Sequence, residues 1–472
     1  MLSVPPEIEP NSEMSNSRLN FRMLVGASIV CWLLVLWVFN ASRYLRPVAD
    51  DYCIGVRGDL GPIDGFINDF QSYSGFATPS FLTNLFVGVP LANGSLWIAS
   101  SITFVAAALG ISLLAFSALV AAGGRARSLR LILIQIAMIV PIAMVAWWTF
   151  LWFPTEASTE SPMDKLAIGL THWQNLNSAY VLPTALILSA GLLLLRPSTR
   201  RNWLVTLARA FLGLVTGLMG PTFAMAAVLF LSLLAAWVAL KGASSMRRYL
   251  IDIGVSLLTV IIGLLIAYLS PGTQARASRY DAGSVAFEPD SIVGWVMGIL
   301  PRNLFLFGEL LLHWGTLAVF TLFLGLGFFA SKKISDLRTE TFLPITIGLT
   351  VFGVSLTSAT LITDTFAYGA YWHSSSIAVV AFAVCSSFGF WAGGVLASQT
   401  RDTSYLVASF ALLVGLASVV GPSFDLSTSI VEREKEWANG PAWITGIIED
   451  REVEWIRNCA NDLGRVNPVF LR

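Results

Sequence analysis

The stretch FRMLVGASIVCWLLVLWVFN, residues 21–40, decides the fold of this chain. Its one charged residue is Arg22, and the rest of the run is almost entirely apolar. A helix needs roughly 20 such residues to cross the hydrocarbon core of a bilayer. The whole chain repeats this pattern, since 55% of its 472 residues are hydrophobic and only 12% are charged. Soluble domains carry about 25% charged residues, so the composition predicts an all-α, polytopic transmembrane helical bundle.

Eleven apolar runs are long enough to be expected crossings. Gly220-Pro221 separates the fifth run from the sixth, because proline disfavours continuation of a helix and the combined stretch is too long for one span. We therefore expect a tight hairpin at that point. The expected crossings lie near residues 21–40, 96–121, 131–153, 178–195, 203–219, 222–240, 249–269, 312–330, 342–361, 375–397 and 404–421.

The short segments between these runs differ in charge, which predicts the orientation. Four of them, GGRARSLR, RPSTRRNW, KGASSMRR and SKKISDLR, each contain three Lys or Arg. All four fall on the same side of the membrane in an eleven-crossing count, together with Arg18, Arg22 and Arg401. Because cytoplasmic loops are enriched in Lys and Arg, we expect the amino terminus inside and the carboxyl terminus outside.

This orientation divides the chain into three parts. Residues 1–20 are polar, which is typical of a disordered cytoplasmic tail. Residues 21–421 form the transmembrane domain, and residues 422–472 form a small external helical tail, in which Ser429 and Glu432 have the spacing of a capping box. The external loops are expected at 41–94, 154–177, 270–311 and 362–374, with interfacial helices inside them at 61–88 and 281–311.

The net charge and the cysteines narrow the class of protein. The formal net charge is zero, so no overall positive field favours nucleic acid. Cys31 and Cys385 lie in apolar runs, whereas Cys53 and Cys459 lie in polar segments, and no spacing matches a zinc site. Cys53 and Cys459 can form a disulfide if both face the same oxidising compartment; otherwise both stay free.

RPVADDYC, residues 46–53, places two adjacent carboxylates just after the first expected crossing. Asp50 and Asp51 repel each other, which favours protonation of one of them unless a cation or metal lies nearby. Such a group can accept a proton from an attacking hydroxyl, so both are candidate catalytic residues. A polar cap that ends the helix is the alternative explanation. The later acids of the same loop, including Asp69, fit a solvated loop.

LSPGTQARASRY, residues 269–280, opens the third expected external loop. Pro271-Gly272 ends the seventh crossing, and Arg276 and Arg279 follow three residues apart. That spacing places both guanidinium groups on one face if the segment is helical. The planar donor fork of arginine suits phosphate oxygens, so we expect the pair to bind a lipid phosphate. Ordinary contact with phospholipid headgroups is the alternative.

Two further external segments combine aromatic rings with hydrogen-bonding side chains. They are THWQNLNSAY, residues 171–180, and DTFAYGAYWHSSS, residues 364–376. Sugars bind such sets by stacking their C–H faces on rings and by directed hydrogen bonds. Anchoring at the membrane interface explains the aromatic residues equally well, but it explains the His, Asn and Asp less well. The candidate sugar- or acceptor-binding residues are His172, Trp173, Asn175, Asp364, Tyr371, Trp372 and His373.

The overall plan and two short motifs resemble the GT-C class of membrane glycosyltransferases. ADDYC after the first crossing and SPGTQAR after a later one resemble a bacterial GT-C-like group that has an Asp-Asp-aromatic motif, a Gly-Arg element and a Pro-Gly-Asn-x-x-Arg element. The resemblance implies a polyprenyl-phosphate sugar donor, used on the non-cytoplasmic face of a bacterial plasma membrane. It also implies Asp50 or Asp51 as the base, and Arg276 as the contact to the donor phosphate with Arg279 beside it.

Two positions depart from that group's pattern. Gly75-Phe76 stands where the group has Gly-Arg, and Thr273 stands where it has Asn. These changes leave open a diverged specificity or an inactive relative. The implied reaction is a single inverting transfer of a sugar to a cell-envelope glycan or lipid acceptor, in which Arg276 stabilises the charge on the leaving phosphate. A divalent metal between Asp50 and Asp51 is open as well, although the sequence assigns it no further ligand.

Three other functions stay open: a ligase or polymerase of lipid-linked glycans, a transporter or flippase of lipid-linked or small polar substrates, and a silent scaffold. Transporters often contain inverted repeats with matching helix breaks, and only the Gly-Pro break at residues 220–221 is evident. Arg209 and Asp252 are the only ionisable residues deep in the apolar runs, fewer than pumps usually contain.

Overall fold

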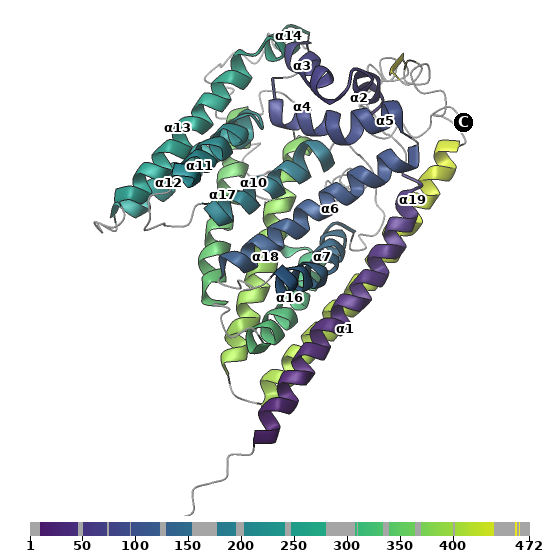
Figure 1. Ribbon diagram of the computed structural model, residues 1–472, viewed down its shortest axis with the longest axis vertical. Helices are drawn as coiled ribbons and strands as arrows, with labels where there is room; N and C mark the ends of the chain where they lie inside the picture. Colours follow the sequence, from purple (N-terminus) through teal and green to yellow (C-terminus); the bar gives the residue numbers. More distant parts are fainter. Residues whose placement is uncertain are drawn as a thin grey trace, which may run out of the picture.

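The computed structural model consists of long helices that run side by side, with a group of short helices at one end (Figure 1). Every regular element in the described residues is a helix, so the predicted all-α fold is confirmed. The described residues are 10–45, 51–72, 75–94, 96–122, 129–152, 177–194, 203–240, 247–279, 307–308, 310–333, 339–363, 370–399, 402–438, 458–459 and 462.

Nine helices in these residues are long and apolar enough to span a membrane, and two shorter apolar helices accompany them. All eleven coincide with expected crossings, which supports an integral membrane protein; the number that cross and their orientation stay predictions. The nine lie in α1 (Pro10–Ser42), α6 (Leu96–Ala121), η2 (Asn177–Val181) with α10 (Leu182–Leu194), α12 (Pro221–Leu240), α13 (Arg247–Leu269), α16 (Trp314–Lys333), α17 (Phe342–Thr363), α18 (Ala370–Ser398) and α19 (Asp402–Ala438), and the two shorter ones lie in α7 (Leu129–Trp152) and α11 (Trp203–Gly217).

Aromatic side chains fill the centre of the bundle, where α7 meets α18. Trp147 and Phe150 of α7 meet the ring of Phe382 on α18 edge-on, at centroid distances of 5.5 and 5.8 Å. All three side chains are buried. Because lipid tails are as apolar as these side chains, dense packing rather than escape from water holds helices together in a membrane.

A proline inside α7 explains one contact between helices. Pro141 has no N–H, so the carbonyl of Ala137, four residues earlier, lacks its usual helical donor. The indole Nε1–H of Trp32 on α1 donates to that carbonyl at 2.9 Å. A side chain of α1 thus supplies the hydrogen-bond donor that Pro141 of α7 cannot give to this carbonyl.

A close turn joins α11 to α12. Gly220 lies in the left-handed region with a φ of 122°, a conformation that glycine adopts without strain, and Pro221 then begins α12. α13 packs against both helices. The expected tight hairpin between the fifth and sixth apolar runs is therefore confirmed.

Small residues hold α11 and α13 close together. A Cβ on Gly213 of α11 would overlap Ser256 and Thr259 of α13, and a Cβ on Gly217 would overlap Val260. The contacts advance in the same direction along both helices, so α11 and α13 are parallel while α12 runs back between them. Glycines spaced by four residues are a common device for close approach of membrane helices.

An ion pair links the same two helices within their apolar part. Arg209 of α11 pairs with Asp252 of α13, and its side chain is only 2% exposed. Its Nε–H also donates to the carbonyl of Leu194, the last residue of α10, at 2.8 Å. The two ionisable residues that the sequence places deep in apolar runs therefore neutralise each other, which avoids the cost of an unpaired charge in hydrocarbon.

Removing one charge of this pair is expected to cost more than removing both. Asp252→Leu removes the carboxylate that pairs with the buried Arg209 guanidinium and should lower the free energy of unfolding by about 3 kcal/mol. Arg209→Met should cost less, because Asp252 is 19% exposed and keeps some solvation. Thermal unfolding in detergent micelles measures the effect. A double variant less stable than Asp252→Leu would contradict the pairing.

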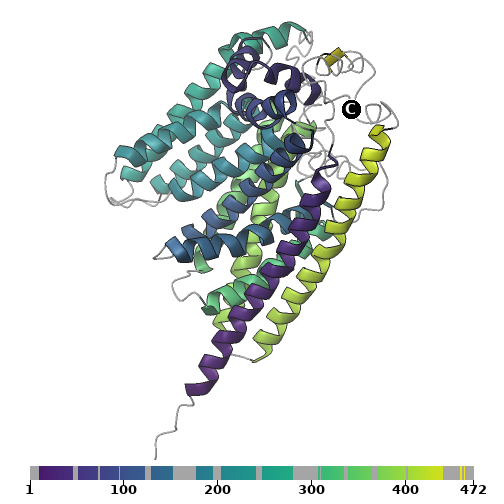
Figure 2. The ribbon, with the colours of Figure 1, turned by 45° about the vertical axis from the view of Figure 1, so that its right-hand side comes forward.

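The two longest described helices, α1 and α19, lie side by side along one flank (Figures 1 and 2). Trp37 of α1 meets Phe424 of α19 at a centroid distance of 5.2 Å. Both helices are longer than expected. α1 begins at Pro10, inside the expected disordered tail. α19 does not end near residue 421 but continues through Pro422 to Ala438. An established helix adds residues without a new nucleation cost, and packing on α1 compensates for the proline.

Five short segments form what we call the cap, at one end of the bundle (Figure 1). The first expected external loop, 41–94, is therefore mostly helical, and the interfacial helix expected at 61–88 is divided among three of these segments. α14 (Pro271–Arg279) lies against the cap. The helix expected at 281–311 falls largely outside the described residues. The cap consists of α2 (Asp51–Gly58), α3 (Pro62–Ser72), α4 (Ala77–Thr83), η1 (Asn84–Gly88) and α5 (Val89–Asn93).

Candidate functional site

Asp51 is the first residue of α2, and its side chain is completely buried. A carboxylate in the first turn of a helix is stabilised by the partial positive charge of the free N–H groups there. α1 ends at Ser42, so Asp51 begins a new helix and does not cap the end of the first one. The catalytic role of the acid pair stays a prediction. Asp50 lies outside the described residues.

Close backbone contact fixes α2 against the rest of the cap. A Cβ on Gly58 of α2 would overlap the backbone of Gly88 in η1. Asn84, the first residue of η1, donates from its Nδ2 to the carbonyls of Gly61 and Pro62, at 3.0 and 3.1 Å. π-helical segments such as η1 are rare and often occur at functional sites. The helix that begins with Asp51 is thus rigidly positioned.

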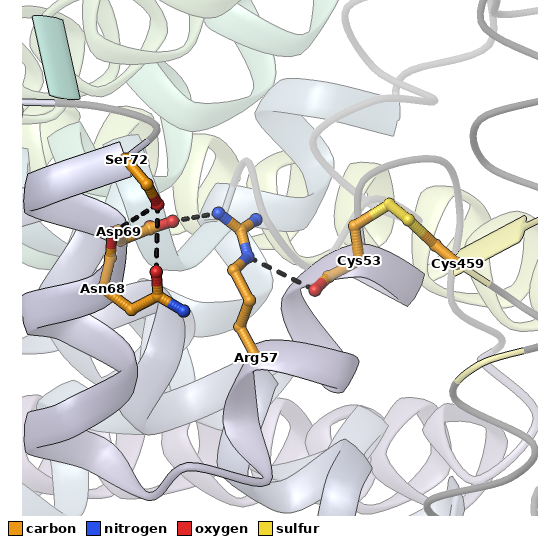
Figure 3. Close-up of polar contacts among 6 residues, drawn as sticks. All are labelled: Cys53, Arg57, Asn68, Asp69, Ser72 and Cys459. Atoms are coloured by element: carbon orange, nitrogen blue, oxygen red, sulfur yellow. Dashed lines mark hydrogen bonds and ion pairs between the residues drawn. A yellow bond between two sulfur atoms is a disulfide. The ribbon is translucent and has the colours of Figure 1, made fainter. Parts of the chain in front are cut away.

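Arg57 of α2 pairs with Asp69 of α3, and its Nε–H donates to the carbonyl of Cys53 at 3.3 Å (Figure 3). The Asp69 side chain is 13% exposed, so the expectation that it belongs to a solvated loop was wrong. Asp69 lies on the same face of α3 as Gly65 and Phe66, at helical spacing from both. The apolar pattern of α3 gave no signal of this, because its isoleucines, Ile63 and Ile67, are exposed.

A disulfide joins Cys53 to Cys459, with a Cα–Cα distance of 4.8 Å (Figure 3). The pairing that the sequence left open is therefore present. It ties α2, the helix that begins with Asp51, to a residue 406 positions away. Cys31 and Cys385 are free and buried.

Thiol counting tests this pairing directly. Denatured, unreduced protein should react with two equivalents of an alkylating reagent, at Cys31 and Cys385, and reduced protein with four. Cys53→Ser should also lower stability by about 2–4 kcal/mol, because the cross-link no longer limits the unfolded chain. Cys385→Ser is the matched control, since it removes a buried thiol that bridges nothing. Four reactive thiols before reduction would rule out the disulfide.

Residues 75–78 are clamped between two helix junctions. The Gly75 N–H donates to Thr273 Oγ1 at 3.2 Å, and Thr273 Oγ1 in turn donates to the carbonyl of Ala267 at 2.7 Å. On the other side, Thr78 donates from its N–H to the carbonyl of Leu218 and from Oγ1 to that of Val215. Two segments singled out by the sequence, Gly75-Phe76 and the Pro-Gly-Thr segment, are therefore in direct contact.

Both departures from the GT-C-like pattern lie at this clamp. Thr273 accepts from Gly75, and the ring of Phe76 lies 3.5 Å from where a Cβ on Gly220 would stand. Phe76 thus occupies the space over the α11–α12 turn, at the position where the pattern has an arginine. The two altered positions belong to one packed unit, not to separate parts of the chain.

The clamp predicts that Gly75 tolerates no side chain. A Cβ there would overlap Ser270 Oγ and the carbonyl of Ala267, so Gly75→Ala should destabilise the protein by about 1–3 kcal/mol, the usual cost of overpacking. The matched control variant is Gly254→Ala on α13, because a Cβ at that position meets no atom within 4 Å. Equal thermal unfolding midpoints for the two variants would show that the clamp is not tightly packed.

α13 ends at Leu269 and α14 begins at Pro271, as expected from the Pro-Gly pair. Arg276 and Arg279 both lie in α14, so their three-residue spacing places them on one helix face. α14 packs against α3 of the cap. The described structure thus brings the arginine-bearing helix to the same end of the bundle as Asp51; it gives no positions for the two guanidinium groups.

Buried hydroxyl groups form two separate hydrogen bonds, one between η2 and the cap and one inside the bundle. Ser178 Oγ of η2 donates to Thr83 Oγ1 of α4 at 3.3 Å, and Thr184 and Ser376 share a hydrogen bond of 2.9 Å between α10 and α18. Ser375 Oγ is buried with no partner among the described residues. Ser178 belongs to the predicted sugar-binding segment 171–180, and Ser375 and Ser376 belong to the segment 364–376, whereas Thr83 and Thr184 lie outside both. η2, which includes Ser178, packs against α18, which includes Ser376. Sequence reasoning missed these hydroxyl groups because single Ser and Thr residues are common in membrane helices.

The predicted sugar-binding side chains themselves are not located. Tyr371, Trp372 and His373 lie in the first turn of α18, where the structure gives their backbone only. Four others fall outside the described residues: His172, Trp173, Asn175 and Asp364. No group of three or more His, Cys, Asp or Glu that could hold a metal occurs among the described residues. Asp50 is not among them, so the metal at Asp50 and Asp51 stays a prediction.

Comparison with models of known protein families, with curated proteins and with solved structures finds no match to this chain.

Proposed function

We propose that this protein is a membrane glycosyltransferase that transfers a sugar from a polyprenyl-phosphate donor to a cell-envelope glycan or lipid acceptor. The observation that carries the proposal is the complete burial of Asp51 at the start of α2. Carboxylates are seldom fully buried, and buried ionisable groups are frequent at functional sites. Asp51 begins a helix of the cap, and α14, which carries Arg276 and Arg279, packs against α3 of the same cap.

The proposed reaction needs a base and a charge stabiliser on opposite sides of the sugar. Asp50 or Asp51 takes the proton of the acceptor hydroxyl as its oxygen attacks the anomeric carbon. The bond from that carbon to the lipid phosphate breaks, and the electron pair leaves with the phosphate. Arg276, with Arg279 beside it, stabilises the charge on the leaving group. One displacement inverts the anomeric configuration.

Burial in the cap favours this chemistry. Charges interact more strongly where water is excluded, and a rigid helix holds the carboxylate in a defined position without reorganisation. α2 meets both conditions, through its contact with η1, its ion pair to α3 and its disulfide. The exposed apolar residues Ile63 and Ile67 on α3 and Phe81 on α4 suit a cap that lies at the membrane surface, within reach of a lipid-linked donor.

Neutralising the carboxylate tests the function. We expect wild-type protein in lipid to transfer label from a panel of radiolabelled polyprenyl-phosphate sugars to membrane glycan extract. Asp51→Asn, or Asp50→Asn if that residue is the base, should reduce the rate by about 10²–10⁴-fold, the usual contribution of a general base. Asp59→Asn is the matched control, because Asp59 is an exposed acid directly after α2.

Folding of each variant is checked by its thermal unfolding midpoint and by the two-thiol count. Full activity in both folded Asn variants would remove the acid pair from the mechanism. If wild-type protein consumes no donor but moves labelled lipid-linked sugar between leaflets, the transporter or flippase function replaces the transferase.

A further inference from the structure

A cavity of about 140 Å³ lies inside the bundle, far from the cap. Leu24 of α1 lines it, whereas the chain enters the cap only after Ser42, about 27 Å further along the helix at 1.5 Å per residue. α6 leaves the cap at Leu96 and lines the cavity with its last turns, including Leu114 and Ala118. We call this space the far cavity.

The lining of the far cavity is almost entirely apolar. Rings come from α16, α17 and α18, and alanines on α6, α7, α16 and α18 leave the space open. Its two lining hydroxyls are already satisfied: Ser386 Oγ donates to the carbonyl of Ala383, and Ser387 Oγ shares a hydrogen bond of 2.8 Å with Thr346 Oγ1. The lining therefore presents no open hydrogen-bonding group to water or to a sugar.

An apolar space of this size favours an apolar occupant. An engineered apolar cavity of about 150 Å³ in another protein stays dry and binds benzene. At membrane depth the abundant apolar molecules are lipid chains. A chain entering from the bilayer gains little from leaving its lipid neighbours, since they are equally apolar. It does gain the dispersion contacts that an empty cavity lacks.

The charge at this end of the bundle indicates which lipid. Arg22 is exposed two residues before Leu24. In the sequence, residues 123–130 between α6 and α7 contain three arginines, and residues 331–338, which run from the end of α16 toward α17, contain three Lys or Arg. All four of these helices line the cavity. Clusters of cations beside membrane-spanning helices attract anionic headgroups.

We propose that the far cavity binds an acyl chain of an anionic phospholipid from the leaflet at the basic end of the bundle. The proposal is independent of glycosyl transfer, because Leu24 of the cavity lining lies about 27 Å along α1 from the residue at which the chain leaves for the cap.

Photo-crosslinking tests it. The full-length protein is placed in nanodiscs containing phosphatidylglycerol with a diazirine at the end of one acyl chain, and cross-linked peptides are mapped by mass spectrometry. We expect cross-links on cavity-lining residues of α6 and α18. Ala118→Phe fills the cavity and should reduce them about tenfold, a change of 1.4 kcal/mol in binding. Leu113→Phe is the matched control, because Leu113 is on the same helix but 42% exposed and outside the lining.

Ala383→Leu on α18 provides a second cavity-filling variant if Ala118→Phe does not fold. Cross-links confined to the outer surface of the bundle, or equal yields in wild type and both filled variants, would overturn the proposal. A phosphatidylcholine probe with the same diazirine should give clearly fewer lining cross-links. Equal yields from the two lipids would overturn the assignment of an anionic lipid.

Discussion

Hydrocarbon offers no partner to a peptide group, so each backbone N–H and C=O at membrane depth has to be satisfied within the protein. Helices meet most of this requirement, and side chains meet it where helices are interrupted or end. Trp32 donates to the carbonyl that Pro141 leaves open, and Arg209 donates to the last carbonyl of α10. Thr78 donates to two carbonyls at the end of α11. Each of these hydrogen bonds also joins separate segments of the chain. The same contacts therefore satisfy backbone carbonyls and hold the bundle together.

The same requirement explains where polar chemistry can gather. Within the bundle, most buried polar side chains bond to backbone or pair with each other, as Arg209 and Asp252 do, and Ser117 and Ser375 are exceptions among the described residues. The short helices of the cap bury several polar side chains close together in the sequence, among them Ser80, Thr83 and Asn84. Asp51 is buried there, and Ser178 of η2 donates to Thr83 of the cap from the bundle.

The sequence predicted the parts of this structure that depend on local composition. Apolar runs located all eleven long or short membrane helices, and Gly220-Pro221 and Pro271-Gly272 located two helix boundaries because proline and glycine act locally. It did not predict what depends on contacts between distant residues. The continuation of α19 through Pro422 rests on packing against α1, and the burial of Asp69 rests on Arg57. Of the candidate site, it identified Asp51 and the arginine-bearing helix, but not the clamp at Gly75 that joins them to the bundle.

The disulfide restricts the topology by parity. Cys53 and Cys459 can be joined only if both lie on the same side of the membrane, so the chain between them must cross an even number of times. Ten of the eleven apolar helices lie between the two cysteines, two of them short. If either short helix, in α7 or in α11, fails to cross, the other must fail as well or a further crossing must replace it. The disulfide at the cap therefore makes the crossing of one short helix depend on the crossing of the other.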